Sequence, residues 1–369
     1  MKALISKVRG YIPLFSLIVY LITLISLVLH LIIIKNASFA DFFNYNLSAP
    51  TRAFMSYLTY IVPFSVAEIF IIFSPIILAF FIFLAVKFAK KGKKASIRFL
   101  SVVLAVACLI FVLFVWTYSS GFHMSTIDDK MELDKDNITH DELYLASSMF
   151  VDALNSLVEE IEYDETNASV MPYSYWEMSK KINDAYESFV EKHPVVRTYN
   201  SRVKPIILSE PMTYTHISGI YTYMSGEANV NVNYPDYIVA STAAHEMAHQ
   251  RGIAREDEAN FIAFAVLLES DDPFLRYSAY LDVYSTVLNN LYRENPEQYF
   301  ALAGRLDQRV KNDIKSYNEF FKKYAESKAS DVADSVNNSY LQSNGQVEGT
   351  KSYGMITEII CAYLLKKTK

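Results

Sequence analysis

The segment TAAHEMAHQRGIAREDEANF, residues 242–261, contains the residue types of a hydrolytic metal site. His245 and His249 are four residues apart, so on a helix they lie on one face and both imidazoles can reach one ion. Glu246 lies about 100° around that helix, where it can accept a proton from a metal-bound water without becoming a ligand. This HExxH spacing predicts a Zn²⁺ site with Glu246 as general base. The alternative is a surface helix with two incidental histidines.

The apolar stretch YIVASTAA before the motif argues against that alternative, because it predicts a buried helix in which unpartnered histidines would be costly. A catalytic zinc needs a third protein ligand, and Gly252 predicts a helix end after which the chain turns back. On the next helix Glu256 and Asn260 share a face, so we expect Glu256 to bind the metal and Asn260 to orient a ligand histidine. Glu258, on the opposite side, remains the alternative ligand.

Three long apolar runs precede this region, at about 11–34, 61–86 and 99–118. Each reaches the roughly 20 residues needed to cross a bilayer, so we predict three transmembrane helices. Residues 1–118 carry many basic side chains and only two acidic ones, Asp41 and Glu68, whereas the remainder of the chain is acidic. The predicted architecture is a membrane domain followed by a soluble one.

The positive charges fix the expected orientation. Lys2, Lys7 and Arg9 precede the first run, and a basic cluster at 87–98 separates the second from the third, whereas the 36–60 loop has only Arg52. By the positive-inside rule, the amino terminus is cytoplasmic and residues 119–369 lie outside the membrane.

The periodicity of apolar residues in the soluble part predicts a mostly helical α+β domain at 139–369, after a polar linker at 119–138. A small sheet is expected between about 205 and 235, where short β-branched and aromatic runs are broken by glycines. Cys108 and Cys361 lie in the third run and near the carboxyl terminus, so no disulfide framework is expected.

The strand expected at 226–234, directly before the metal helix, occupies the place where an edge strand would hold an extended substrate by main-chain pairing. This predicts a substrate contact at Gly226, Ala228 and Val230. Nearby, Tyr223, His216 and Tyr221 are candidates for oxyanion stabilisation, although packing is an equally available explanation for a tyrosine.

"HEMAH" followed by "EDEAN" resembles the gluzincin arrangement, which implies His245, His249 and Glu256 as zinc ligands, Glu246 as base and Asn260 as support for a histidine. The start of the metzincin motif is also present, but Arg255 occupies its third-ligand position. Over most of its length the chain resembles an uncharacterised bacterial membrane family, domain of unknown function 3810, which implies a zincin-like fold and a location in the bacterial cytoplasmic membrane.

These observations predict a membrane-anchored zinc metallopeptidase acting on a peptide or protein substrate, with the lipid bilayer as its other partner and no nucleic acid. The alternative is a non-enzymatic sensor or assembly protein with a structural metal. A structural zinc needs four ligands and no base, whereas this stretch offers three ligands and a base. Manganese, cobalt or iron could occupy the same groups.

The charge asymmetry yields a topology prediction. A reporter fused after Lys369, or the domain itself under protease treatment of intact cells, should be accessible from outside, because the basic loop is retained in the cytoplasm. A carboxyl terminus found in the cytoplasm would contradict the three-helix orientation.

Overall fold

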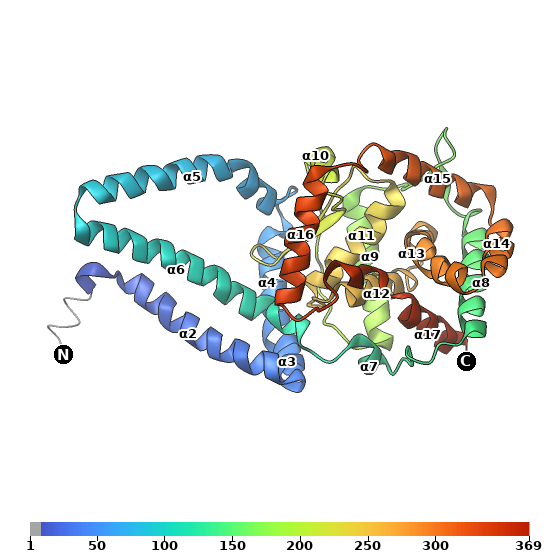
Figure 1. Ribbon diagram of the computed structural model, residues 1–369, viewed down its shortest axis with the longest axis horizontal. Coiled ribbons are helices and arrows are strands. Elements are labelled where there is room, and N and C mark those ends of the chain that lie inside the picture. The colour runs from blue at the N-terminus through green and yellow to red at the C-terminus, as the bar shows by residue number, and fades with distance from the viewer. Residues whose placement is uncertain (1–8, 369) are drawn as a thin grey trace.

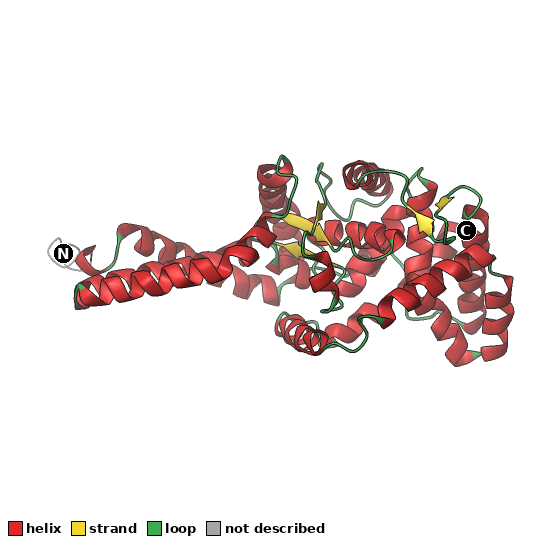
Figure 2. Ribbon diagram, turned by 90° about the horizontal axis from the view of Figure 1, so that it is seen from above, coloured by secondary structure: helices red, strands yellow, loops and turns green. Residues whose placement is uncertain are grey.

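The computed structural model describes residues 9–368 and shows a mostly helical protein in two parts (Figure 1). The helices α2 (Leu14–Lys35), α5 (Val66–Lys90) and α6 (Lys93–Thr117) extend from one side of a globular domain (Figures 1 and 2). Each is long and apolar enough to cross a membrane and contains an 18-residue stretch with a mean hydropathy of 2.9, 3.0 and 3.0, respectively. The prediction of three such helices is confirmed; Lys2 and Lys7, used for the orientation, lie outside the described residues.

The long helices α2 and α6 lie side by side, whereas α5 meets α6 at a short turn and diverges from it towards the domain (Figure 1). Polar pairs join α2 to α6: the Tyr20 hydroxyl donates to the Ser101 carbonyl at 2.7 Å, and the Trp116 indole donates to Ser26 Oγ at 3.0 Å. Such interhelical hydrogen bonds satisfy polar groups that lipid cannot.

A helical connection joins α2 to α5 at the domain end of the long helices. It consists of α3 (Ala37–Phe43), the π-helical turn η1 (Asn44–Ser48) and α4 (Ala49–Tyr60). Because this connection links two helices of membrane-spanning length, it lies at the level where a membrane surface would meet the domain.

The domain contains short and long helices around two small sheets. Its helices are η2 (Ser119–Phe122), α7 (Ile127–Met131), α8 (His140–Leu157), α9 (Tyr175–Lys192), α10 (Ser209–Thr213), α11 (Asp236–Gln250), α12 (Glu256–Leu267), α13 (Pro273–Glu294), α14 (Pro296–Arg305), α15 (Gln308–Lys322), α16 (Lys328–Ser343), η3 (Gly349–Gly354) and α17 (Thr357–Thr368). Its strands are β1 (Glu162–Tyr163), β2 (Ser169–Val170), β3 (Lys204–Pro205), β4 (Gly219–Thr222) and β5 (Glu227–Val230).

The segment 119–138 differs from the linker that its polar composition predicts. Residues 119–122 are buried as η2, and α7 follows with Thr126 as its N-cap. Gly121 allows this close packing, since a side chain there would place Cβ 2.4 Å from the Gly252 carbonyl oxygen. The first half of this segment therefore packs against the domain, through a long-range contact that local composition does not reveal.

The predicted small sheet between 205 and 235 is present with the strand order β3-β5-β4. Strand β5 pairs parallel with β3 and antiparallel with β4, with Gly219 opposite Val230. The prediction that residues 226–234 form an edge strand was therefore wrong: β5 is the central strand, and β4 forms one edge. A separate two-stranded hairpin, β1–β2, was not predicted.

Helix α11 lies in the centre of the domain, packed against α12, α13 and β5. It carries a run of fully buried alanines, Ala240, Ala243, Ala244 and Ala248, whose small side chains allow neighbouring elements to approach closely. The Tyr186 hydroxyl of α9 donates to the Ala244 carbonyl at 2.9 Å. The HExxH segment is thus held in a closely packed core.

Two glutamates connect the domain to the start of α5. Glu227 of β5 accepts hydrogen bonds from the backbone N–H groups of Val66 and Ala67 at 3.0 and 3.1 Å. In return, Glu68 of α5 accepts from the N–H groups of Ile207 and Leu208 at 2.9 and 2.7 Å. A carboxylate at a helix N-terminus accepts hydrogen bonds from the free backbone N–H groups and interacts favourably with the positive end of the helix dipole. These four hydrogen bonds therefore hold the start of α5 firmly against the domain.

Candidate metal centre

The end of α11 places both histidines of the motif on one face. The rings of His245 and His249 lie with centroids 4.5 Å apart. Gly252 has a φ of 99°, and its N–H donates to the His249 carbonyl, while the N–H of Ile253 donates to the Ala248 carbonyl. These are the two bonds of a Schellman motif, so the helix ends where Gly252 predicts.

This turn delivers the first residue of α12 to the histidines. Glu256 Oε2 lies 3.2 Å from His245 Nε2 and 3.3 Å from His249 Nε2. The ligand atoms of the three residues all lie within 4.8 Å of one another. In a tetrahedral site with metal–ligand bonds of about 2.1 Å, neighbouring ligand atoms are about 3.4 Å apart. The spacing therefore fits a small divalent cation.

Electrostatics favour a cation at this point. Glu256 Oε2 is buried without a hydrogen-bond partner, although two imidazole nitrogens lie close to it. Burial opposes ionisation of Glu256, but the two imidazoles hold its pKa well below the usual range. Burial likewise lowers the pKa of His249, and Glu256 overcomes this and raises it to about 9. The three groups thus stabilise a positive charge between them, and a metal would displace the proton.

Glu258, the alternative third ligand, points elsewhere. Its carboxylate pairs with Arg255 at 2.7 Å and accepts the backbone N–H of Ile127 at 2.9 Å. The structure therefore groups Glu256, and not Glu258, with the two histidines. Arg255, which occupies the metzincin ligand position, instead serves as the counter-ion of Glu258.

Glu246 lies beside this group without belonging to it. The side chain is buried, its Oε2 has no hydrogen-bond partner, and burial raises its pKa to about 7 against the lowering effect of both histidines. Strand β4 covers it: a Cβ at Gly219 would lie 2.6 Å from Glu246 Oε1. Only glycine leaves room for the carboxylate here. Sequence reasoning used Gly219 only as a strand break.

The orientation of His249 comes from residues that sequence reasoning did not identify. Its Nδ1 lies 2.7 Å from the Ile253 carbonyl oxygen, which can only accept, so Nδ1 carries the proton and Nε2 is free to bind a metal. The Tyr118 hydroxyl lies 3.1 Å from the same nitrogen. Asn260 is one turn beyond Glu256 on α12, and its support of a ligand histidine stays a prediction.

Of the three predicted oxyanion candidates, Tyr221 and Tyr223 both pack against Tyr118, whereas His216 lies elsewhere. His216 directs its Nε2 to the Tyr324 carbonyl at 2.7 Å and packs on Phe321, so it belongs to the α15 side of the domain. Tyr223 stacks on Tyr118 with ring centroids 6.2 Å apart. The Tyr221 ring lies 5.4 Å from that of Tyr118, and its buried hydroxyl has no hydrogen-bond partner.

The predicted substrate contacts on β5 are inaccessible. Ala228 and Val230 are fully buried. Gly226 has a φ of 69°, and its carbonyl accepts a hydrogen bond from Gln250 Nε2 at 2.7 Å. Strand β5 lies between β3 and β4, so it offers no free edge to an added strand, and Gly226 directly before it is buried.

Comparison with known proteins identifies one family. The family model described as "Protein of unknown function (DUF3810)" matches residues 43–361. No curated protein and no solved structure shows a significant match.

The geometry predicts that substitutions of Glu256 and Glu258 affect zinc retention to different degrees. Glu256→Gln should weaken zinc retention by about 10-fold or more, because it removes the charged ligand, whereas Glu258→Gln should leave retention nearly unchanged. Metal content of the purified full-length variants after dialysis against graded chelator measures this. Circular dichroism checks folding, since Glu258 also pairs with Arg255. Greater metal loss in Glu258→Gln would reassign the third ligand.

Proposed function

Because the chain belongs to the DUF3810 family of unknown function, we propose its activity from the site: it is a membrane-anchored, zinc-dependent peptidase. The observation that carries the proposal is a set of three ligands, His245, His249 and Glu256, beside a buried carboxylate that is not one of them. A structural zinc site uses four protein ligands and has no need of a neighbouring base. A three-ligand site leaves one position open for chemistry.

The residues around the site have separate tasks in peptide hydrolysis. A bound zinc ion would acidify water and polarise the scissile carbonyl. Glu246 accepts the proton of the attacking water and returns it to the leaving amine; its pKa, raised by burial to about 7, suits both directions of transfer. Ile253 and Tyr118 hold the His249 ring in place.

Strand β4 is the element that can position a peptide. It is an edge strand, and Gly219 within it contacts Glu246. An extended peptide that pairs with this edge lies directly beside the base. The polar backbone of β4, rather than a pocket for a particular side chain, provides the binding energy, which suits a polypeptide substrate.

The second candidate function is a non-enzymatic sensor or assembly protein in which the metal holds the domain to the membrane helices. The contact that favours it is the one between His249 and Tyr118, which directly follows α6. Such a protein needs the ligands but has no use for the proton-accepting ability of Glu246.

Glu246→Gln separates the two candidates. Glutamine keeps the shape and can hydrogen-bond water but cannot accept its proton, so zinc should stay bound while peptidase activity falls by about 10²- to 10⁴-fold. Full-length protein of equal zinc content, wild type and variant, is compared on a peptide library. Equal cleavage by both would reject Glu246 as the base. A cellular phenotype rescued equally by both would favour the scaffold.

We also place the site at the outer surface of the cytoplasmic membrane, with the amino terminus inside. The positive-inside rule supports this orientation. The short distance from the metal centre to the membrane follows from Tyr118, which directly follows α6 and contacts His249. The substrate bond must therefore come close to the bilayer.

This location predicts a dependence on substrate tethering. In proteoliposomes, a peptide anchored to the bilayer through a spacer of about 5 residues should be cleaved at least about 10-fold faster than one with a spacer of about 40 residues, because the effective concentration at the surface falls with spacer length. Initial rates at equal bulk concentration measure this, with Glu246→Gln as the blank. Rates independent of spacer length would reject the surface location, and Glu246-dependent cleavage of a free peptide would still support the peptidase.

A further inference from the structure

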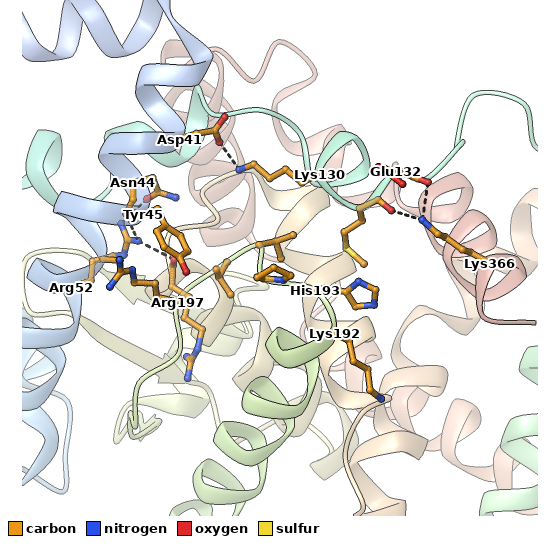
Figure 3. A pocket seen from close by; sticks show the side chains of 16 residues that line it. Asp41, Asn44, Tyr45, Arg52, Lys130, Glu132, Lys192, His193, Arg197 and Lys366 are labelled. Atoms are coloured by element: carbon orange, nitrogen blue, oxygen red, sulfur yellow. Dashed lines mark hydrogen bonds and ion pairs between the residues drawn. The ribbon is translucent and has the colours of Figure 1, made fainter.

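A pocket lies at the junction between the domain and the long helices. This pocket, of about 510 Å³, lies between the α3–η1–α4 connection, α7 and the chain after α9 (Figure 3). None of the four residues of the metal centre lines it. It therefore forms a separate feature with its own chemistry.

The pocket wall is strongly cationic. The cationic side chains are Arg52, Lys130, Lys192, Arg197, Arg251 and Lys366, against two carboxylates, Asp41 and Glu132. Asp41 is already engaged, because its Oδ1 pairs with Lys130 at 2.6 Å. Lys366 donates to backbone carbonyls of Met131 and Glu132 (Figure 3). The wall carries more positive charge than its own carboxylates neutralise.

Two of these cations are buried without an acidic partner. Arg52 and Arg251 are each 1% exposed, and neither forms an ion pair with a described carboxylate. Their terminal nitrogens donate to carbonyl, amide and hydroxyl oxygens, but the Nε of each has no hydrogen-bond partner. A buried unpaired donor on a cation is costly unless an anion or water satisfies it.

Arg197 is an exposed arginine of the wall, as Lys192 and Lys366 are exposed lysines of it. The Arg197 guanidinium lies 4.4 Å from the centre of the Tyr45 ring, and no described carboxylate pairs with it. A guanidinium stacked in this way keeps its fork of N–H donors free for a planar or tetrahedral oxyanion. Figure 3 shows Tyr45 and Arg197 on the side of the pocket formed by η1 and the chain after α9.

The position of the pocket points to the headgroup level of a bilayer. Its η1 wall belongs to the connection between α2 and α5, two helices of membrane-spanning length. Next to Tyr45 on this connection, the apolar side chains of Phe42 and Leu47 are 55% and 40% exposed. A lipid could place its phosphate in the cationic pocket and its acyl chains along this apolar surface.

From these features we propose that the pocket binds a phosphate group, supplied by the headgroup of a phospholipid at the membrane surface. Arg197 provides the accessible charge-assisted hydrogen bonds, and the buried guanidiniums of Arg52 and Arg251 provide the underlying positive field. This site is independent of the peptidase proposal, because it requires neither the metal nor Glu246.

The chain offers a matched control for the test. Arg202, on the same connection after α9, lies 4.7 Å from the centre of the Trp176 ring and is not part of the pocket wall. Arg197→Glu and Arg202→Glu therefore cause an equal change of charge, each at an arginine that stacks on an aromatic ring near the membrane helices. Only the first alters the pocket.

The full-length protein in neutral detergent is titrated with fluorescent phosphatidylglycerol, and separately with inorganic phosphate as competitor. Arg197→Glu should weaken lipid binding by about 10-fold or more and Arg202→Glu by less than about 2-fold, since the first removes phosphate contacts and the second only changes the surrounding field. Thermal unfolding of each variant checks folding. A milder Arg197→Gln should give an intermediate loss.

Competition with inorganic phosphate shows whether the bound phosphate group belongs to a phospholipid or to a soluble ligand. Lipid binding that depends on Arg197 and resists millimolar inorganic phosphate supports the lipid headgroup. Inorganic phosphate that binds alone, with the same dependence on Arg197, supports the phosphate site but assigns it to a soluble ligand. Equal lipid and phosphate binding by wild type, Arg197→Glu and Arg202→Glu would overturn the proposal.

Discussion

A single buried cation, Arg52, joins the membrane helices to α11, the helix that carries His245 and His249. Its Nη1 donates to the Thr117 carbonyl and to Asn44 Oδ1, both at 2.8 Å, and its Nη2 donates to the Arg251 carbonyl at 3.0 Å. Thr117 is the last residue of α6 and Arg251 directly follows α11, so one positive charge lies at the negative ends of two helix dipoles. The packing leaves no tolerance: a Cβ at Gly252 would lie 2.3 Å from Arg52 Nη2.

This interaction also fixes the position of the candidate metal centre relative to the membrane helices. Because the end of α11 is fixed to α6, the histidines near that end lie at the membrane-facing side of the domain. The same turn that brings Gly252 against Arg52 reverses the chain and delivers Glu256 to the histidines. The grouping of the candidate metal ligands and the contact with α6 thus both depend on the end of one helix, and the hydrogen bonds of Glu227 and Glu68 are a second, separate junction with the membrane helices.

The charged side chains near the end of α11 are divided between its two sides. On one side of the α11 terminus, carboxylate and imidazole groups create a place for a cation; on the other, Arg52, Arg251 and Arg197 create a place for an anion. The backbone of the turn separates the two.

Local sequence patterns determined much of this protein. The apolar runs predicted the three long helices because length and hydropathy alone decide whether a helix suits a bilayer. The spacing of His245, Glu246 and His249 and the conformation of Gly252 depend on a few consecutive residues, so they too could be predicted. The spacing placed Glu256 and Glu258 on different helix faces but could not show which face meets the histidines.

Tertiary structure decided the remainder. Tyr118 reaches His249 across 131 residues, Arg52 reaches the Arg251 carbonyl across 199, and Glu227 reaches α5 across 161, and no local periodicity records such contacts. For the same reason the sequence did not reveal that residues 119–122 are buried, and β5 was wrongly predicted to be an edge strand. A strand's neighbours and a helix end's partners depend on packing between distant segments, and the free energy of that packing does not appear in any short stretch of sequence.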